Sequence, residues 1–308
     1  MMLRFTKFFL WIIVIGFGII ALYLFFAIVF NDAYFNHSHK IDTKLASDFG
    51  QFFGGFVGTM FAISGTLLIL VTLISQIIEN KKNQVTNHFF KMLDYHNENV
   101  RQITVSHVNP SKDEKSEGRR AFVIFKLQLR ELLSIVDSIN KKSKLDLTDE
   151  QIIDIAYIAF YYGLDNDWED FSEDKFSRYE DKALIMKKLL KEKGKSKLKI
   201  GRTNQTSLSS YFRNMYNAIK MVDRNKYLTK KEKVELIKIL RAQLSNPELY
   251  VLFFNLVSRF GKKWKDRKLI IKYEFVKNIP NGYCERFNPN DFFPMIYEEN
   301  ELNKNNFA

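Results

Sequence analysis

GQFFGGFVGTMFAISGTLLILV, residues 50–71, is the stretch that decides the fold of this chain. It is apolar enough to cross a bilayer, yet small residues recur at every fourth position from just before it through its first half. A helix places positions four apart on one face, so these residues form a single, slowly drifting stripe. The stripe consists of Ala46, Gly50, Gly54, Gly58, Ala62 and Thr66.

Glycine weakens a helix, and an anchor needs only apolar length. A stripe of small side chains lets a second backbone approach closely, which is how many helices pack in lipid. We therefore interpret Gly50, Gly54, Gly58 and Ala62 as a helix-packing face. Its partner is either the first apolar segment or a second copy of the chain. The alternative, that small residues are merely common in membrane helices, stays open.

A second apolar run, Phe8–Phe30, carries no charge and is long enough to cross a bilayer core of ~30 Å. A cleaved signal peptide fits less well, because its apolar core is about 7–15 residues long. We expect a cytoplasmic tail and first transmembrane helix in residues 1–30, a short external loop in 31–50 and a second transmembrane helix in 51–79. Basic residues near the span ends place both termini in the cytoplasm by the positive-inside rule.

The chain has 308 residues and a net charge of +12, with 29 Phe, 13 Gly and 5 Pro. Few turn formers and many long side chains favour helices joined by short loops. The single cysteine, Cys284, excludes an intramolecular disulfide, which fits a reducing compartment. With no Cys or His beside it, we interpret Cys284 as a small residue without chemistry.

Beyond the spans, apolar residues recur at helical spacing, and no strand alternation persists. We expect a stalk helix in residues 80–106, a helical cytosolic domain in 107–278 and an irregular tail in 279–308. Thr148 with Gln151, and Thr229 with Glu232, have the spacing of capping boxes, and Pro247 suits a first helical turn. The predicted fold is all-α: an N-terminal transmembrane hairpin followed by a helical cytosolic domain.

The usual enzyme signatures are missing from the sequence. It contains no GxxxxGK[ST] loop, no HExxH and no CxxC, so we expect no cofactor and no metal. Helical RNase toxins often place an Arg a few residues before a His, and Arg101 with His107 is the one match. Because that spacing arises easily by chance, the catalytic residues remain unknown, and we favour a mechanism without catalysis.

The run MKKLLKEKGKSKLKIGR, residues 186–202, has eight basic residues against one Glu. Such a run is usually a solvated surface, but it also suits an anionic lipid surface or nucleic acid. Without interleaved aromatics for base stacking, nucleic acid is the less favoured partner. The basic residues are Lys187, Lys188, Lys191, Lys193, Lys195, Lys197, Lys199 and Arg202.

The segment 241–261, RAQLSNPELYVLFFNLVSRFG, mixes polar residues into a mostly apolar helix. Buried polar groups need partners, so this pattern indicates a hydrogen-bond network between helices or, alternatively, a recognition site. The residues concerned are Arg241, Gln243, Ser245, Glu248 and Asn255.

Four further blocks accompany the opening stretch: FFKMLDYHNENV (89–100), GRRAF (118–122), YFRNMYNAIKMVD (211–223) and ILRAQLSNPELYVLFFNLVSRFG (239–261). Together they resemble the phage abortive infection proteins of the AbiC type, which are bacterial membrane proteins. The resemblance extends from about Phe9 to Asn278, and its most specific part is RAQLS-x-x-EL. It supplies no established catalytic residues.

The resemblance implies antiphage defence at the bacterial inner membrane, with an unknown infection trigger. We expect the cytosolic domain to sense infection and the transmembrane hairpin to form homo-oligomers that perturb the membrane, with lipids as partners. One alternative is a membrane-anchored RNase-like or other hydrolase toxin. Another is a membrane-tethered binding module that recruits a separate effector.

Overall fold

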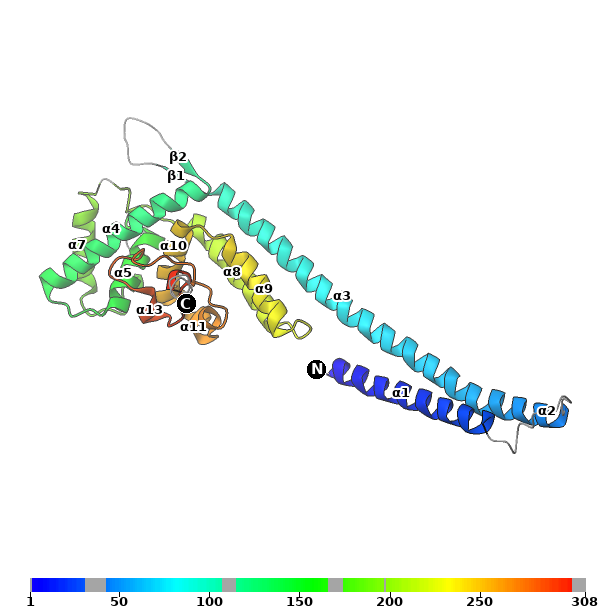
Figure 1. Cartoon of the computed structure of the whole chain (residues 1–308). Coiled ribbons are helices and arrows are strands. Elements are labelled where there is room, and N and C mark those ends of the chain that lie inside the picture. Colours follow the sequence, from blue (N-terminus) through cyan, green and yellow to red (C-terminus); the bar gives the residue numbers. More distant parts are fainter. Residues whose placement is uncertain (1, 31–42, 107–114, 166–173, 197, 301–308) are drawn as a thin grey trace. The chain divides into compact units, whose positions relative to one another are not determined.

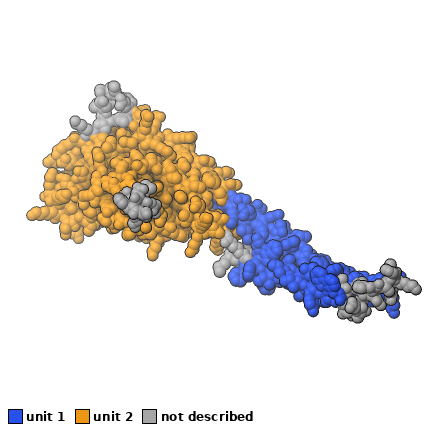
Figure 2. Space-filling model, in the orientation of Figure 1, with its two compact units in different colours: residues 1–85 blue, residues 86–308 orange. Residues whose placement is uncertain are grey.

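The computed structural model describes every residue except 1, 31–42, 107–114, 166–173, 197 and 301–308 (Figure 1). The chain divides into two compact units, Met1–Val85 and Thr86–Ala308, coloured separately in Figure 2. We refer to the second unit as the helical body. The all-α expectation is confirmed, because the only strands among the described residues are two segments of three residues each.

Unit 1 consists of two antiparallel helical segments (Figure 1). The first is α1 (Met2–Val29). The second comprises α2 (Thr43–Phe52), the π-helical turn η1 (Phe53–Val57) and the beginning of α3 (Gly58–Gln102), which follow one another without a gap. By length and composition, the segments Phe5–Ala27 and Thr43–Gln102 each suffice to cross a membrane.

The second segment begins earlier than the sequence predicts. Residues 43–50, expected in a short external loop, are helical, so the helix that contains the second apolar segment begins before residue 51. This segment has no proline, and its Leu45 and Phe49 lie four apart on one half-buried face, which favours a helix. The rest of the expected loop, residues 31–42, lies outside the described residues.

Large side chains make the contact between the two segments of unit 1. Leu10 of α1 packs in a cluster with Val71 and Ile74 of α3. Farther along, the rings of Phe25 and Phe53 lie 5.4 Å apart, edge to face. Many other apolar side chains are exposed, as suits lipid-facing positions; these include Phe8, Phe9, Ile19 and Ile69.

The predicted stalk helix of residues 80–106 ends at Gln102, before its expected end. Residues Thr104–Ser106 form β1, which pairs antiparallel with β2 (Lys115–Glu117). The consecutive β-branched residues Ile103, Thr104 and Val105 favour extended backbone over helix, which accounts for the change.

The helical body is built around two helices that are buried on all sides. These are α5 (Asp149–Tyr162) and α10 (Asn246–Val257), which pack against each other. The long amphipathic helix α4 (Arg119–Ser143) packs on both and on α7 (Lys182–Lys193). Helix α8 (Gln205–Arg224) packs on α5 and on α9 (Lys230–Ala242). A helix that is apolar on every face needs such a central place.

Both predicted capping boxes are present. Gln151 and Thr148 bond reciprocally at the start of α5, as do Glu232 and Thr229 at the start of α9. A third box, between Ser245 and Glu248, opens α10 with Pro247 in its first turn, and its S-x-x-E spacing was readable in the sequence.

The C-terminal segment is more than an irregular tail. After the short turns η3 (Arg259–Gly261), α11 (Lys262–Asp266) and α12 (Leu269–Lys272), it continues through α13 (Pro289–Phe292). The segment from residue 279, predicted as an irregular tail, consists mostly of turn and helical residues, and it contributes buried side chains to the body. Isolated apolar residues between prolines and asparagines give no helical period, although they pack well; they are Ile279, Phe287, Phe293 and Tyr297.

Candidate functional site

The most unusual group in the helical body is a buried carboxylate at the start of α10. Glu248 is only 1% exposed. Its Oε2 accepts hydrogen bonds from the backbone N–H of Ser245 at 2.8 Å and from the Ser245 hydroxyl at 2.5 Å. Its Oε1 accepts one from the Tyr211 hydroxyl of α8 at 3.4 Å. A buried charge requires such partners, since a lone one is very costly.

Arg119, the first residue of α4, supplies the opposite charge. Its Nε lies 3.8 Å from Glu248 Oε2, and its Nη2 donates to the Gln243 carbonyl at 2.8 Å. The preceding residue, Gly118, has φ +60°, a left-handed conformation that glycine adopts without strain. Its N–H donates to the Ile103 carbonyl, so this turn joins the strand pair to α4.

The C-terminal part of α3 docks on the same place. The imidazole of His96 lies against the Tyr211 ring, with centroids 4.7 Å apart. His96 is 1% exposed, and its Nδ1 has no hydrogen-bond partner in the described part of the chain. Burial, and then the nearby positive charge of Arg119, lower the pKa of His96 from 6.5 to about 4. The imidazole is therefore neutral at pH 7.

A backbone contact reinforces this docking. Asn214, on α8, donates from Nδ2 to the Met92 carbonyl of α3 at 2.8 Å. Phe89, one turn earlier on α3, is fully buried. We call the cluster of His96, Arg119, Tyr211, Ser245 and Glu248 the α3 junction. In it, the end of α3 contacts α8 through His96 and Tyr211, and hydrogen bonds and one ion pair link α8, α10 and α4.

The α3 junction brings together all four cytosolic blocks quoted in the sequence analysis. His96 comes from FFKMLDYHNENV, Arg119 from GRRAF, Tyr211 from YFRNMYNAIKMVD, and Ser245 and Glu248 from RAQLSNPEL. Sequence reasoning singled out Ser245 and Glu248 but missed Arg119 and Tyr211 as their partners. The available signal was the Arg that follows the lone glycine of GRRAF.

The other residues of the predicted polar network lie elsewhere. Arg241 donates from Nη1 to the Glu274 carbonyl at 2.8 Å. Asn255 donates to the hydroxyl of the fully buried Tyr157 at 2.9 Å, which links α10 to α5. The backbone carbonyl of Gln243 accepts the hydrogen bond from Arg119 Nη2. These contacts fasten helices together, and they do not surround a common cavity.

A largely buried ion pair between Asp154 and Arg259 was not predicted from the sequence. The Asp154 carboxylate, on α5, accepts hydrogen bonds from the Arg259 guanidinium, the shortest being 2.6 Å, and from the Tyr179 hydroxyl at 2.6 Å. Burial raises the pKa of Asp154, but the bonds from Arg259 and Tyr179 outweigh it and hold that pKa below 3.8. Asp154 interrupts the apolar run IIDIAYIAF, which was its signal in the sequence.

The weak catalytic pair gains no support from geometry. Arg101 is exposed at the end of α3 and lies 4.0 Å from Glu98. His107 lies outside the described residues. Within the described ranges, no group of three or more His, Cys, Asp or Glu is arranged to hold a metal. Cys284 is buried, and burial raises the pKa of its thiol.

The residues of the basic run separate into different roles. Lys193 donates to the Leu164 carbonyl at 2.6 Å and pairs with Asp165 at 3.1 Å, so it fastens the loop after α5. Lys199 offers its carbonyl to Gln128. Lys197 lies outside the described residues. Lys187 and Arg202 are exposed. The remaining three, Lys188, Lys191 and Lys195, line a cavity with α4.

The small-residue stripe is open in unit 1. A side-chain Cβ placed at Gly50 or Gly54 would have no atom within 4 Å outside its own helix. At Gly58 the nearest atom is the Phe53 carbonyl oxygen, at 3.6 Å, which belongs to the turn just before. Ala62 is exposed. Among the described residues, therefore, α1 does not use this face.

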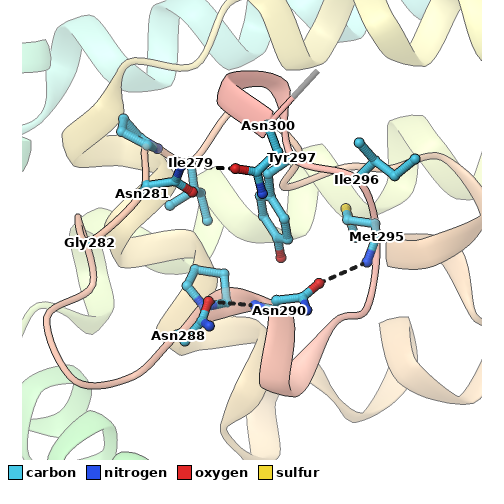
Figure 3. Close-up of a pocket in the computed structure, with 11 residues that line it drawn as sticks. Ile279, Asn281, Gly282, Asn288, Asn290, Met295, Ile296, Tyr297 and Asn300 are labelled. Carbon is cyan, nitrogen blue, oxygen red and sulfur yellow. Dashed lines mark hydrogen bonds between the residues drawn. The ribbon is translucent and has the colours of Figure 1, made fainter. Parts of the chain in front are cut away.

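The C-terminal segment encloses a cavity of about 400 Å³ lined by four asparagines (Figure 3). The Asn290 side chain accepts from the Met295 N–H at 3.3 Å, and the Asn288 side chain accepts from the Asn290 N–H at 3.1 Å. Asn281 donates to Asn300 at 3.1 Å. These amides bind one another and the backbone, and so they hold the segment in its folded path.

Part of the helical body matches a known protein family. The family model described as "Putative phage abortive infection protein" matches residues 203–283. The segment is thus similar to phage abortive infection proteins. It spans α8 to α12 and includes Tyr211, Ser245 and Glu248, whereas His96 and Arg119 lie before it. The match supports a role in phage defence, and it covers a shorter part of the chain than the resemblance described above. No curated protein and no solved structure matches the chain.

Proposed function

We propose that this chain is a bacterial inner-membrane protein of phage defence, whose helical body senses infection and whose transmembrane hairpin is the effector. Both termini lie in the cytoplasm in this proposal, and lipids surround the hairpin. The family match at residues 203–283 supports the defence role. Two helices long and apolar enough to cross a membrane support the location.

The α3 junction supports the route between sensor and effector. Helix α3 begins at Gly58 among the apolar residues and ends at Gln102, beside the buried cluster. A trigger that binds the body and loosens the contact between His96 and Tyr211 changes how the end of α3 is held. The trigger acts only through its different affinity for the docked and released states.

The observation that carries the effector step is the open stripe of Gly50, Gly54, Gly58 and Ala62. Large residues such as Leu10 and Val71 already make the contact within the hairpin. The small residues are therefore free to receive a helix of another copy at short distance. The Gly54–Gly55 pair within the π-helical turn lets this part of the helix bend as copies associate.

The test is phage challenge of cells that express this gene alone, with membrane potential and RNA integrity followed together. We expect potential to fall before RNA is degraded. Gly54→Leu combined with Gly58→Leu should abolish protection, because the larger side chains keep the backbones apart. Gly16→Leu with Gly18→Leu is the matched control, since a Cβ at either glycine would meet no atom within 4 Å and both lie on α1, away from the stripe.

Loss of protection in the control pair as well would show that any added bulk in the span is harmful, and the assembly proposal would fall. Cell death with the potential intact would refute membrane perturbation. Cleaved RNA under those conditions would point instead to a tethered nuclease, and co-purification with a second gene product required for protection would point to a recruiting module.

A further inference from the structure

A cavity of about 500 Å³ lies between α4 and α7. Four lysines line it: Lys142 of α4, Lys188 and Lys191 of α7, and Lys195 just beyond α7. We call it the lysine groove. Ser134 and Ser138 add hydroxyl groups, and Ile135 and Ile139 add apolar surface. All of these residues belong to the helical body.

Helical spacing explains why these side chains meet. Ser134, Ser138 and Lys142 follow one another at four-residue intervals and so share one face of α4. On α7, Lys188 and Lys191 are three apart and also share a face, and Lys195 follows four residues later. Because α4 packs against α7, the two polar faces border a common hollow.

The lysine groove has far more positive than negative charge. Glu192, the only carboxylate among the described residues that line the groove, accepts a hydrogen bond from Lys195 at 2.7 Å. That bond, together with the field of Lys195, Lys142 and Lys191, lowers the pKa of Glu192. Lys188 donates to the Ser143 hydroxyl, a neutral group. Among the described residues, no carboxylate forms an ion pair with Lys142, Lys188 or Lys191. Like charges held together in this way favour an anionic ligand.

A neighbouring concavity shows the contrast. It shares Ser134 with the lysine groove and contains Arg130 and Arg286, but its carboxylates outnumber these cations. Arg286 is moreover bound to Asp137 at 3.0 Å and to Asp149 at 2.7 Å. The carboxylates of that surface balance its arginine charges, whereas the lysine groove keeps an excess of positive charge.

Favourable interaction with helix C-termini explains only part of the cluster. Lys142 and Lys191 lie in the last turns of α4 and α7, where cations suit the helix dipole. Lys141 and Lys193 occupy the same turns without lining the groove. Lys188 lies a turn earlier than this effect requires, and Lys195 lies beyond the helix.

We propose that the lysine groove binds a small ligand with two or more phosphate groups. Ammonium groups and serine hydroxyls are suitable donors to phosphate oxygens. The cavity volume falls in the range of small-ligand sites, about 300–1,000 Å³. No aromatic residue is among its described lining residues, so the phosphates, and not a stacked base, provide the recognition. This site is separate from the α3 junction and does not depend on the proposed effector mechanism.

The test uses the full chain in discs of zwitterionic lipid, titrated calorimetrically with inorganic pyrophosphate. We expect saturable binding that Lys188→Gln with Lys191→Gln weakens at least about tenfold, since two charge-assisted contacts are lost. Lys182→Gln with Lys187→Gln removes the same charge from α7 outside the groove and should leave the affinity within about twofold of wild type.

A second arm distinguishes the source of the phosphate. The titration is repeated in discs that contain cardiolipin, a lipid whose headgroup carries two phosphate groups. Weaker pyrophosphate binding there, in wild type only, identifies a lipid headgroup as the occupant, and unchanged binding identifies a soluble phosphate compound. Absence of binding in zwitterionic discs, or equal loss in the two pairs of variants, would overturn the proposal.

Discussion

The strongest prediction concerns acidification of the α3 junction. His96 has a pKa of about 4 in the folded chain against 6.5 for a solvated histidine. The folded state therefore resists protonation where the unfolded state accepts it, and stability falls as the pH drops below 6.5 towards 4. Arg119 is the cation that faces His96 from α4, and Tyr211 and Glu248 face the same cluster from α8 and α10.

Linkage gives the size of this effect. At pH 5 the unfolded histidine is mostly charged and the folded one mostly neutral, so His96 alone removes about 2 kcal/mol of unfolding free energy between pH 7 and pH 5. The assay is urea unfolding of the full chain in detergent, followed by near-ultraviolet circular dichroism at both pH values. Other groups also titrate between pH 7 and pH 5. Their contribution to the unfolding free energy is measured with a variant that lacks the imidazole and is then subtracted.

His96→Phe keeps a ring against Tyr211 and removes the titration. From pH 7 to pH 5, we expect the unfolding free energy of this variant to fall by about 2 kcal/mol less than that of wild type. His88→Phe, at an exposed position of the same helix, serves as the control and should behave like wild type. If His96→Phe has the same pH dependence as wild type, the imidazole is not held neutral and the reasoning is refuted.

Three further predictions test the body. Glu248→Ala should destabilise it by about 1–3 kcal/mol, measured by hydrogen exchange in α10, because the Ser245 N–H and the buried Tyr211 hydroxyl lose their acceptor. The exposed Glu235→Ala should have an effect within about 0.5 kcal/mol. Gly163→Ala should lower the melting temperature far more than Gly282→Ala: both have positive φ, but a Cβ at Gly163 would lie 2.6 Å from a backbone oxygen. Arg101→Ala should leave protection against phage intact, and its loss would favour the nuclease alternative.

Features that depend on neighbouring residues in the chain were predictable. The capping boxes at Thr148 and Thr229, the amphipathic helix α4 and the two apolar segments all follow from three- and four-residue spacing. The helix bounds differ from the expected ones where the spacing is ambiguous. The helix start at Thr43 lies in a polar stretch, and the early end of α3 depends on a short run of β-branched residues.

The sequence by itself determined the helical class, the apolar length of two segments and the stripe of small residues, because each is a local or periodic property. Only the tertiary structure decided that His96, Arg119, Tyr211 and Glu248 meet, since their partners are distant in sequence and depend on how helices pack. It also decided that large side chains, and not glycines, join the two segments of unit 1. Residues spaced four apart lie on one face of a helix, whereas the contacts which that face makes depend on the surrounding fold.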